Sequence, residues 1–175
     1  MLDNYEQAKE FHEIFDPVVQ TTPHVLETKE ASYRMGFKIE EIVEFLHATA
    51  QGDTQLFEQL INELHSSIDQ AKVKMVTKET FTTSKPSEED CLVGQVDAML
   101  DLLYFVNGTF VRMGIDPRPL SEIVHQANMG KVFPDGLPHY DTVTGKVLKP
   151  ENWEHDFAPE AKLQEEILRQ KKASE

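Results

Sequence analysis

The spacing of apolar residues along the chain predicts helices over most of its length. Apolar positions recur with helical periodicity over residues 3–15, 29–50, 54–76, 88–113 and 117–130, and a charged C-terminal helix is expected over about 160–172. Between 132 and 159 the chain is rich in turn residues, with a small hairpin possible around Thr142 to Gly145. The expected fold is therefore all-α. It is a bundle of about five helices with an irregular tail, in a single domain 1–175 whose core covers about 3–131.

Residues with a preference for helix ends lie between these segments. Gly52 is expected to end the second helix, and Asp53 to cap the third. Ser87 and Asp90 have the spacing of a capping box at the start of the fourth helix, and the Asp116-Pro117 pair is typical of a helix start.

The second helix carries the motif E-E-x-x-E. At ~100° per residue, Glu40, Glu41 and Glu44 fall on one arc, opposite an apolar stripe. An amphipathic helix with a solvated acidic face explains this pattern equally well on its own. However, Phe37 and Phe45 lie within or beside the acidic arc, which indicates that another helix covers it. Three carboxylates held together where water is scarce favour a bound cation.

The fourth helix is the most apolar segment, and its pattern predicts burial. Asp97 and Asp101 lie on it one turn apart, and neither has a Lys or Arg three or four positions away. A distant cation such as Arg34 or Lys38 is one possible partner. A metal ion shared with the second helix is the favoured explanation, since unpaired buried carboxylates are costly.

The charge of the chain limits its partners. Thirty-one acidic residues against seventeen basic ones give a net charge of −14, which argues against nucleic-acid binding. A nucleoside triphosphate is compatible with this charge only through divalent cations. No apolar run approaches the ~18 residues of a membrane helix. A single cysteine, Cys91, and an N-terminus without the features of a signal peptide predict a cytoplasmic protein.

Facing helices with clustered carboxylates predict an all-oxygen site for Mg²⁺, or for Mn²⁺. The corresponding chemistry is hydrolysis of a phosphoanhydride, in which a glutamate orients and deprotonates a water associated with the metal. Lys131 and Lys146, close to glycines, are candidate phosphate contacts, and Arg34 is a further candidate substrate contact.

The order of these motifs resembles a known superfamily. E-E-x-x-E, two acids on a later apolar helix, Asn-x-x-Lys and an Asp-Gly…Gly-Lys…Lys-Pro tail together are similar to the all-α nucleoside triphosphate pyrophosphohydrolases. This group includes MazG-like proteins, phosphoribosyl-ATP pyrophosphohydrolases and dimeric dUTPases. The resemblance spans about Phe11 to Trp153. It implies hydrolysis of a nucleoside triphosphate to the monophosphate and pyrophosphate by a homodimer with Mg²⁺.

The resemblance also implies roles for individual residues. The metal ligands would be Glu40, Glu41, Glu44, Asp97 and Asp101, with Glu40 and Glu41 catalytic. Asn128 and Lys131 would contact the substrate's phosphates. The second acidic motif departs from the family's usual E-x-x-D, because its two aspartates are four positions apart. That spacing is still nearly one helical turn, so both side chains can reach one ion.

Two other readings remain open. Glu44 with His47, and Glu122 with His125, form two E-x-x-H pairs, the arrangement that carboxylate-bridged di-iron bundles use. A non-catalytic helical interaction module, with acidic faces that are merely solvated, is the third reading. It predicts that Mg²⁺ does not raise the melting temperature.

Overall fold

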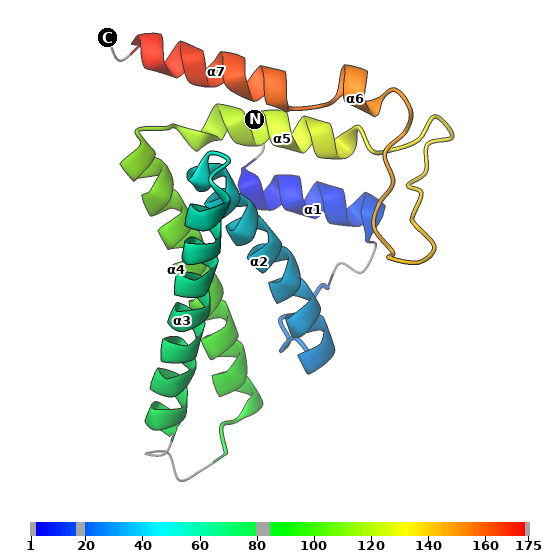
Figure 1. The fold of residues 1–175 in the computed structure, drawn as a ribbon. Helices are drawn as coiled ribbons and strands as arrows, with labels where there is room; N and C mark the ends of the chain where they lie inside the picture. Colours follow the sequence, from blue (N-terminus) through cyan, green and yellow to red (C-terminus); the bar gives the residue numbers. More distant parts are fainter. Residues whose placement is uncertain (1–2, 17–19, 80–84, 174–175) are drawn as a thin grey trace. The chain divides into compact units, whose positions relative to one another are not determined.

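The computed structural model describes residues 3–16, 20–79 and 85–173 (Figure 1). Parts of the connections expected after the first and third helices, residues 17–19 and 80–84, lie outside this description. Within it the helices are α1 (Asn4–Phe15), α2 (Thr28–Ala50), α3 (Thr54–Glu79), α4 (Glu88–Met113), α5 (Pro117–Met129), α6 (Trp153–Asp156) and α7 (Glu160–Ala173). The described residues contain no β-strand beyond an isolated antiparallel bridge between Tyr140 and Val147. The all-α prediction is confirmed.

The predicted end of α2 and start of α3 are confirmed. Gln51 and Gly52 both have positive φ, 51° and 87°, and so end α2 in a left-handed turn. The Asp53 carboxylate then accepts hydrogen bonds from the backbone N–H groups of Gln55 at 2.9 Å and Leu56 at 3.0 Å. These donors have no partner within the helix, so Asp53 fixes the first turn of α3.

The predicted starts of α4 and α5 are confirmed as well. The Asp90 N–H donates to Ser87 Oγ at 3.1 Å, and the Ser87 N–H donates to Asp90 Oδ2 at 3.1 Å. The two hydrogen bonds form the reciprocal capping box. At α5, the Arg118 N–H donates to Asp116 Oδ1 at 3.0 Å, with Pro117 at the first helical position.

The chain forms two compact units. The central unit comprises residues 24–99, and the terminal unit comprises 1–23 together with 100–175. Helix α4 begins in the central unit and ends in the terminal one.

In the terminal unit α1, α5 and α7 pack together, and the core contains Phe15, Leu120, Ala127 and Trp153. Polar side chains join the helices at specific points. Gln7 Nε2 donates to Glu122 Oε2 at 3.0 Å, which joins α1 to α5. At the start of α5, the Gln170 side chain of α7 exchanges two hydrogen bonds, each of 2.9 Å, with the backbone of Asp116.

In the central unit α2 packs against α3. The ring of His47 meets that of Phe57 edge-on, with centroids 5.2 Å apart, and Ala50 at the end of α2 is buried. The start of α4 is tied to the segment before α2. Gln95 Oε1 accepts from the Leu26 N–H at 2.9 Å, and Gln95 Nε2 donates to the Leu26 carbonyl at 3.1 Å.

Helix α4 is more exposed to solvent than its sequence predicted. Val93 is 67% exposed, Phe105 68% and Val111 78%. No residue of α4 is classed as buried. The prediction is wrong for the single chain, because an apolar pattern indicates which surface avoids water but not which molecule covers it.

The tail contains more regular structure than expected. It includes the one-turn helix α6, and the predicted turn is present. The Asp141 N–H donates to the Lys146 carbonyl at 2.8 Å, and Gly145 takes a φ of 69°, which favours glycine. None of the described helices combines the length and hydrophobicity that crossing a bilayer requires.

Candidate functional site

The acidic motif lies in the second half of α2, within the central unit. Partial burial raises the pKa of Glu41 above its ordinary value, and the neighbouring charges of Glu44 and Glu40 raise it further. Each of these causes disfavours the ionised form. The three carboxylates are thus neighbours on one helix, and carboxylate oxygens suit a hard divalent cation. The predicted covering of this face is wrong for the single chain, because the three glutamates are exposed and Phe37 and Phe45 are 40% and 52% exposed.

The second acidic pair lies on α4, with Asp97 in the central unit and Asp101 in the terminal unit. Both side chains are exposed in the single chain, whereas the sequence predicted apolar surroundings. Among the described residues, no three His, Cys, Asp or Glu side chains gather closely enough to hold a metal ion. The five predicted ligands are thus not assembled by this chain alone, and their joint role stays a prediction.

Arg34, a predicted substrate contact, lies on α2 one to two turns before the acidic motif. Its Nε is 3.8 Å from Glu30 Oε1, and its carbonyl accepts a hydrogen bond from Lys38 Nζ at 3.2 Å. Its side chain is partly buried, with 29% exposed. The predicted substrate contact is not tested by these interactions.

Two predicted phosphate contacts meet at the C-terminal end of α5. Lys131 Nζ donates to Asn128 Oδ1 at 2.8 Å. Burial lowers the pKa of Lys131, and the positive charge of Lys149 lowers it further. Lys146, the third predicted contact, lies in the exposed turn of the tail, where its backbone N–H donates to Thr144 Oγ1 at 3.3 Å.

Lys149 belongs to the Lys-Pro pair of the tail, to which the sequence assigned no individual role. Its Nζ lies 3.6 Å from the centroid of the Trp153 ring and 3.5 Å from Glu154 Oε1. Trp153 is buried, and its indole N–H donates to the Ala127 carbonyl of α5 at 2.7 Å. The Lys-Pro pair marks Lys149 in the sequence, but its surroundings depend on a contact between Trp153 and a helix far back in the chain.

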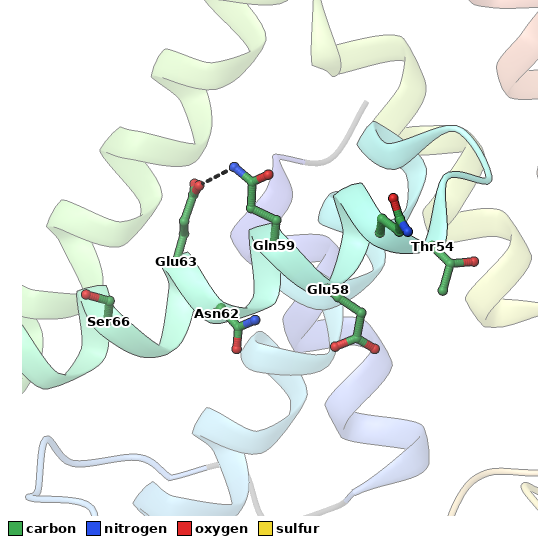
Figure 2. Close-up of a pocket in the computed structure, with 7 residues that line it drawn as sticks. Thr54, Glu58, Gln59, Asn62, Glu63 and Ser66 are labelled. Atoms are coloured by element: carbon green, nitrogen blue, oxygen red, sulfur yellow. Dashed lines mark hydrogen bonds between the residues drawn. The ribbon is translucent and has the colours of Figure 1, made fainter.

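A groove of about 610 Å³ runs along α3 and is lined by polar residues. Figure 2 shows the side chains that line it, among them Gln59 and Glu63, which point toward one another and are joined by a hydrogen bond of 2.9 Å. All the lining residues belong to one helix, and none is a predicted site residue. We therefore do not regard this groove as the functional site.

A second pocket, of about 570 Å³, lies within the terminal unit between α1, α5, α7 and the end of α4. Its walls are mainly apolar, with Phe11, Leu120 and Ile167 among them. Asn128 also lines it, so this pocket adjoins the lysine-bearing end of α5.

The two E-x-x-H pairs have other partners. His125 is buried and its Nε2 lies 3.1 Å from Glu10 Oε2, while Glu122 accepts hydrogen bonds from Gln7 and Gln126. In the other pair, His47 packs against an aromatic ring of α3. With no cluster of three metal-ligating side chains in the described residues, a di-iron site gains no support.

The comparisons with known proteins identify the family of the chain and agree with its helical architecture. Residues 8–128 match the family described as phosphoribosyl-ATP pyrophosphohydrolase. The chain belongs to this family. Membership in this pyrophosphohydrolase family confirms the resemblance seen in the sequence, and it assigns the chain to the hydrolases that act on phosphoanhydrides.

A solved structure supports the same assignment over nearly the full length. It is a crystal structure from Exiguobacterium sp. 255-15 of a protein to which NTP pyrophosphohydrolase activity is attributed. The chain is 38% identical to it, with a TM-score of 0.86 and 99% of each chain covered. No match was found among curated proteins.

Proposed function

We propose that this family member is a Mg²⁺-dependent enzyme that hydrolyses a nucleoside triphosphate, or a related nucleotide, to the monophosphate and pyrophosphate. The observation that carries the proposal is the clustering of three carboxylates on α2, in a chain that matches a pyrophosphohydrolase family over this segment. Desolvation, with the charges of Glu44 and Glu40, raises the pKa of Glu41. Mn²⁺ offers the same preference for oxygen ligands.

The acidic residues supply the proposed metal ligands: Glu40, Glu41, Glu44, Asp97 and Asp101. Bound Mg²⁺ would offset the negative charge of the phosphates and make a water molecule more acidic. Glu41, supported by Glu40, would orient the attacking water and accept its proton. Its raised pKa brings its basicity closer to neutral pH, which favours proton transfer under ordinary conditions.

In the proposed reaction, the oxygen of water forms a bond to the α-phosphorus of the nucleotide. The bond from that phosphorus to the bridging oxygen breaks, and pyrophosphate leaves. Asn128 and Lys131 are the proposed phosphate contacts, and the 2.8 Å hydrogen bond that joins them at the end of α5 supports a shared role. Arg34 and Lys146 are further proposed contacts.

We also propose that the enzyme is a homodimer in which a second copy covers α4. The support is the exposure of apolar side chains such as Val93 and Phe105, which exceeds what an isolated chain in water favours. The exposed free thiol of Cys91 is consistent with the cytoplasm. Light scattering coupled to gel filtration tests the dimer, and a monomer at micromolar concentration would contradict it.

A panel of canonical and modified nucleoside triphosphates tests the activity. Each is incubated with the protein and Mg²⁺, and pyrophosphate release is measured. We expect release from at least one of them, and none when EDTA replaces Mg²⁺. If no nucleotide is turned over, or if orthophosphate is the sole inorganic product, the proposal is wrong.

A further inference from the structure

Two lysines of the terminal unit are positioned by contacts that lead to the last turn of α5. Lys131 lies two residues after the end of α5 and is hydrogen-bonded to Asn128 of that helix. Lys149 lies over the Trp153 ring, and that ring is held by the Ala127 carbonyl, one position before Asn128. The same short stretch of α5 thus positions both ammonium groups.

The backbone around Lys149 is fixed on both sides. The Leu148 N–H donates to the His139 carbonyl at 2.8 Å, and the buried Pro150 accepts from the Trp153 N–H at 2.9 Å. With its flanking residues and its ring partner held, Lys149 loses less conformational freedom on binding a ligand than an ordinary surface lysine does.

The backbone beside Lys131 is also held closely. A Cβ atom at Gly130 would collide with the ring of Phe157, so only glycine allows the ring this close to the chain. The residue before Lys131 is therefore packed against the segment that follows α6. Both lysines belong to one packed region and not to a free loop.

The two lysines have little negative charge beside them, although the protein as a whole carries a net charge of −14. The Lys131 ammonium is bonded to an amide and not to a carboxylate. The carboxylate beside Lys149, Glu154, is 76% exposed and 3.5 Å away, so solvent weakens this ion pair. Burial and the charge of Lys149 both lower the pKa of Lys131, the direction expected when two cations share a site.

An anion with several negative groups relieves this repulsion. We propose that Lys149 acts with Lys131 to hold the phosphate chain of a nucleotide or of pyrophosphate, and that Trp153 is the positioning residue that keeps Lys149 in place. The inference rests on the proposed function for its substrate class. It adds a phosphate-binding lysine and a positioning residue that the acidic motif does not reveal.

The full-length protein is titrated with inorganic pyrophosphate in EDTA, so that no metal contributes to binding. Calorimetry gives the affinity. The chain contains one tryptophan, and its emission reports the site, since the ammonium over the ring is drawn toward the anion. We expect saturable binding with a change in Trp153 emission. Absence of saturable binding would overturn the proposal.

Substitutions identify the residue responsible. Lys149→Gln is expected to weaken pyrophosphate binding by about tenfold or more, and Lys149→Arg to restore most of it. Lys172→Gln, which removes a charge from the exposed last turn of α7, is the matched control and should leave the affinity unchanged. Equal affinity of Lys149→Gln and the unmodified protein would overturn the proposal. Circular dichroism establishes that each variant is folded.

Glu154→Gln distinguishes an anion site from a simple ion pair. If Lys149 serves only to pair with Glu154, removal of the carboxylate does not affect pyrophosphate. If Lys149 binds the anion, the loss of a competing negative charge tightens binding. An unchanged or weaker affinity in this variant would count against the proposed site.

The experiments distinguish a failure of the proposed function from a failure of the proposed role of Lys149. If pyrophosphate binding depends on Lys149 but no nucleotide is hydrolysed with Mg²⁺, the anion site stands and the proposed function fails. If nucleotides are hydrolysed and Lys149→Gln has the KM and kcat of the unmodified enzyme, the function stands and the role of Lys149 fails.

Discussion

The acidic segment of α2 and the lysine-bearing end of α5 carry opposite charges that arise in different ways. On α2 the three glutamates are neighbours on one helix, so the sequence itself brings them together. At α5, Lys131 and Lys149 are far apart in sequence and meet through Trp153 and Asn128. Each region holds like charges that favour a ligand of the opposite sign. Under the proposed function, the acids would bind the metal and the lysines would bind phosphates.

The largest effect, a loss of activity, is expected from Glu41→Gln in the acidic segment of α2. The variant should lose activity by roughly 10²–10⁴-fold, because it removes the proposed base and one metal ligand. Its melting temperature at pH 7 should not fall. The raised pKa of Glu41 means that its ionised form is disfavoured in the folded protein, so a neutral side chain relieves repulsion. Steady-state kinetics and thermal unfolding measure the two effects.

Asp101→Asn should likewise abolish activity while the fold persists. Glu58→Gln, on the polar groove of α3, removes a carboxylate away from the motif and serves as the control. Near-normal rates in Glu41→Gln or Asp101→Asn would show that the ligand assignment is wrong even if the reaction is right.

The second largest effect, a loss of stability, is expected from Trp153→Phe at the lysine-bearing end of α5. The substitution removes the indole N–H and leaves the Ala127 carbonyl without its 2.7 Å donor, at a cost of about 1–3 kcal/mol in the free energy of unfolding. Urea unfolding measures this loss. Tyr5→Phe, at an exposed aromatic side chain, should change stability little. Equal stability of Trp153→Phe and the unmodified protein would show that the tail does not depend on this contact.

A pH titration sharpens the contrast. Because the pKa of Lys131 is lowered, its charge is lost at a lower pH than that of an ordinary lysine. Pyrophosphate affinity in EDTA should therefore decline as pH rises through that value. In Lys149→Gln the decline should move to higher pH, since the neighbouring charge is gone, while burial still keeps it below the usual range. A decline at the same pH in both proteins would contradict the coupling of the two lysines.

The helices and their ends could be predicted because their causes are local. Asp53, Ser87 and Asp116 each cap a helix with donors two or three residues away. Contacts between distant segments could not be predicted. Nothing near Gln7 in sequence indicates Glu122 as its partner, and nothing near Lys149 indicates that Trp153 docks on α5.

The burial of α4 was wrongly predicted for a related reason. Its apolar side chains, such as Phe105 and Val111, indicate a surface that avoids water, and a single chain leaves that surface exposed. The acidic motif lies on one helix, as its sequence pattern predicted. Its completion by Asp97 and Asp101 depends on long-range packing, and so it stays a prediction.

The smallest effect is expected from Asp53→Ala, which removes the N-terminal cap of α3 in the central unit. Loss of the two backbone hydrogen bonds should cost about 1 kcal/mol in the free energy of unfolding, with kcat nearly unchanged. Asp69→Ala, within the same helix and exposed, is the matched control and should not destabilise the protein. If the two variants are equally stable, the Asp53 cap contributes nothing measurable.

The most direct test of the central claim follows the products of one hydrolysed nucleotide by ³¹P NMR, with and without Mg²⁺. The proposed division between metal-binding acids and phosphate-binding lysines predicts equal amounts of nucleoside monophosphate and pyrophosphate, formed only with the metal. Formation of a nucleoside diphosphate and orthophosphate, or equal turnover in EDTA, would contradict it.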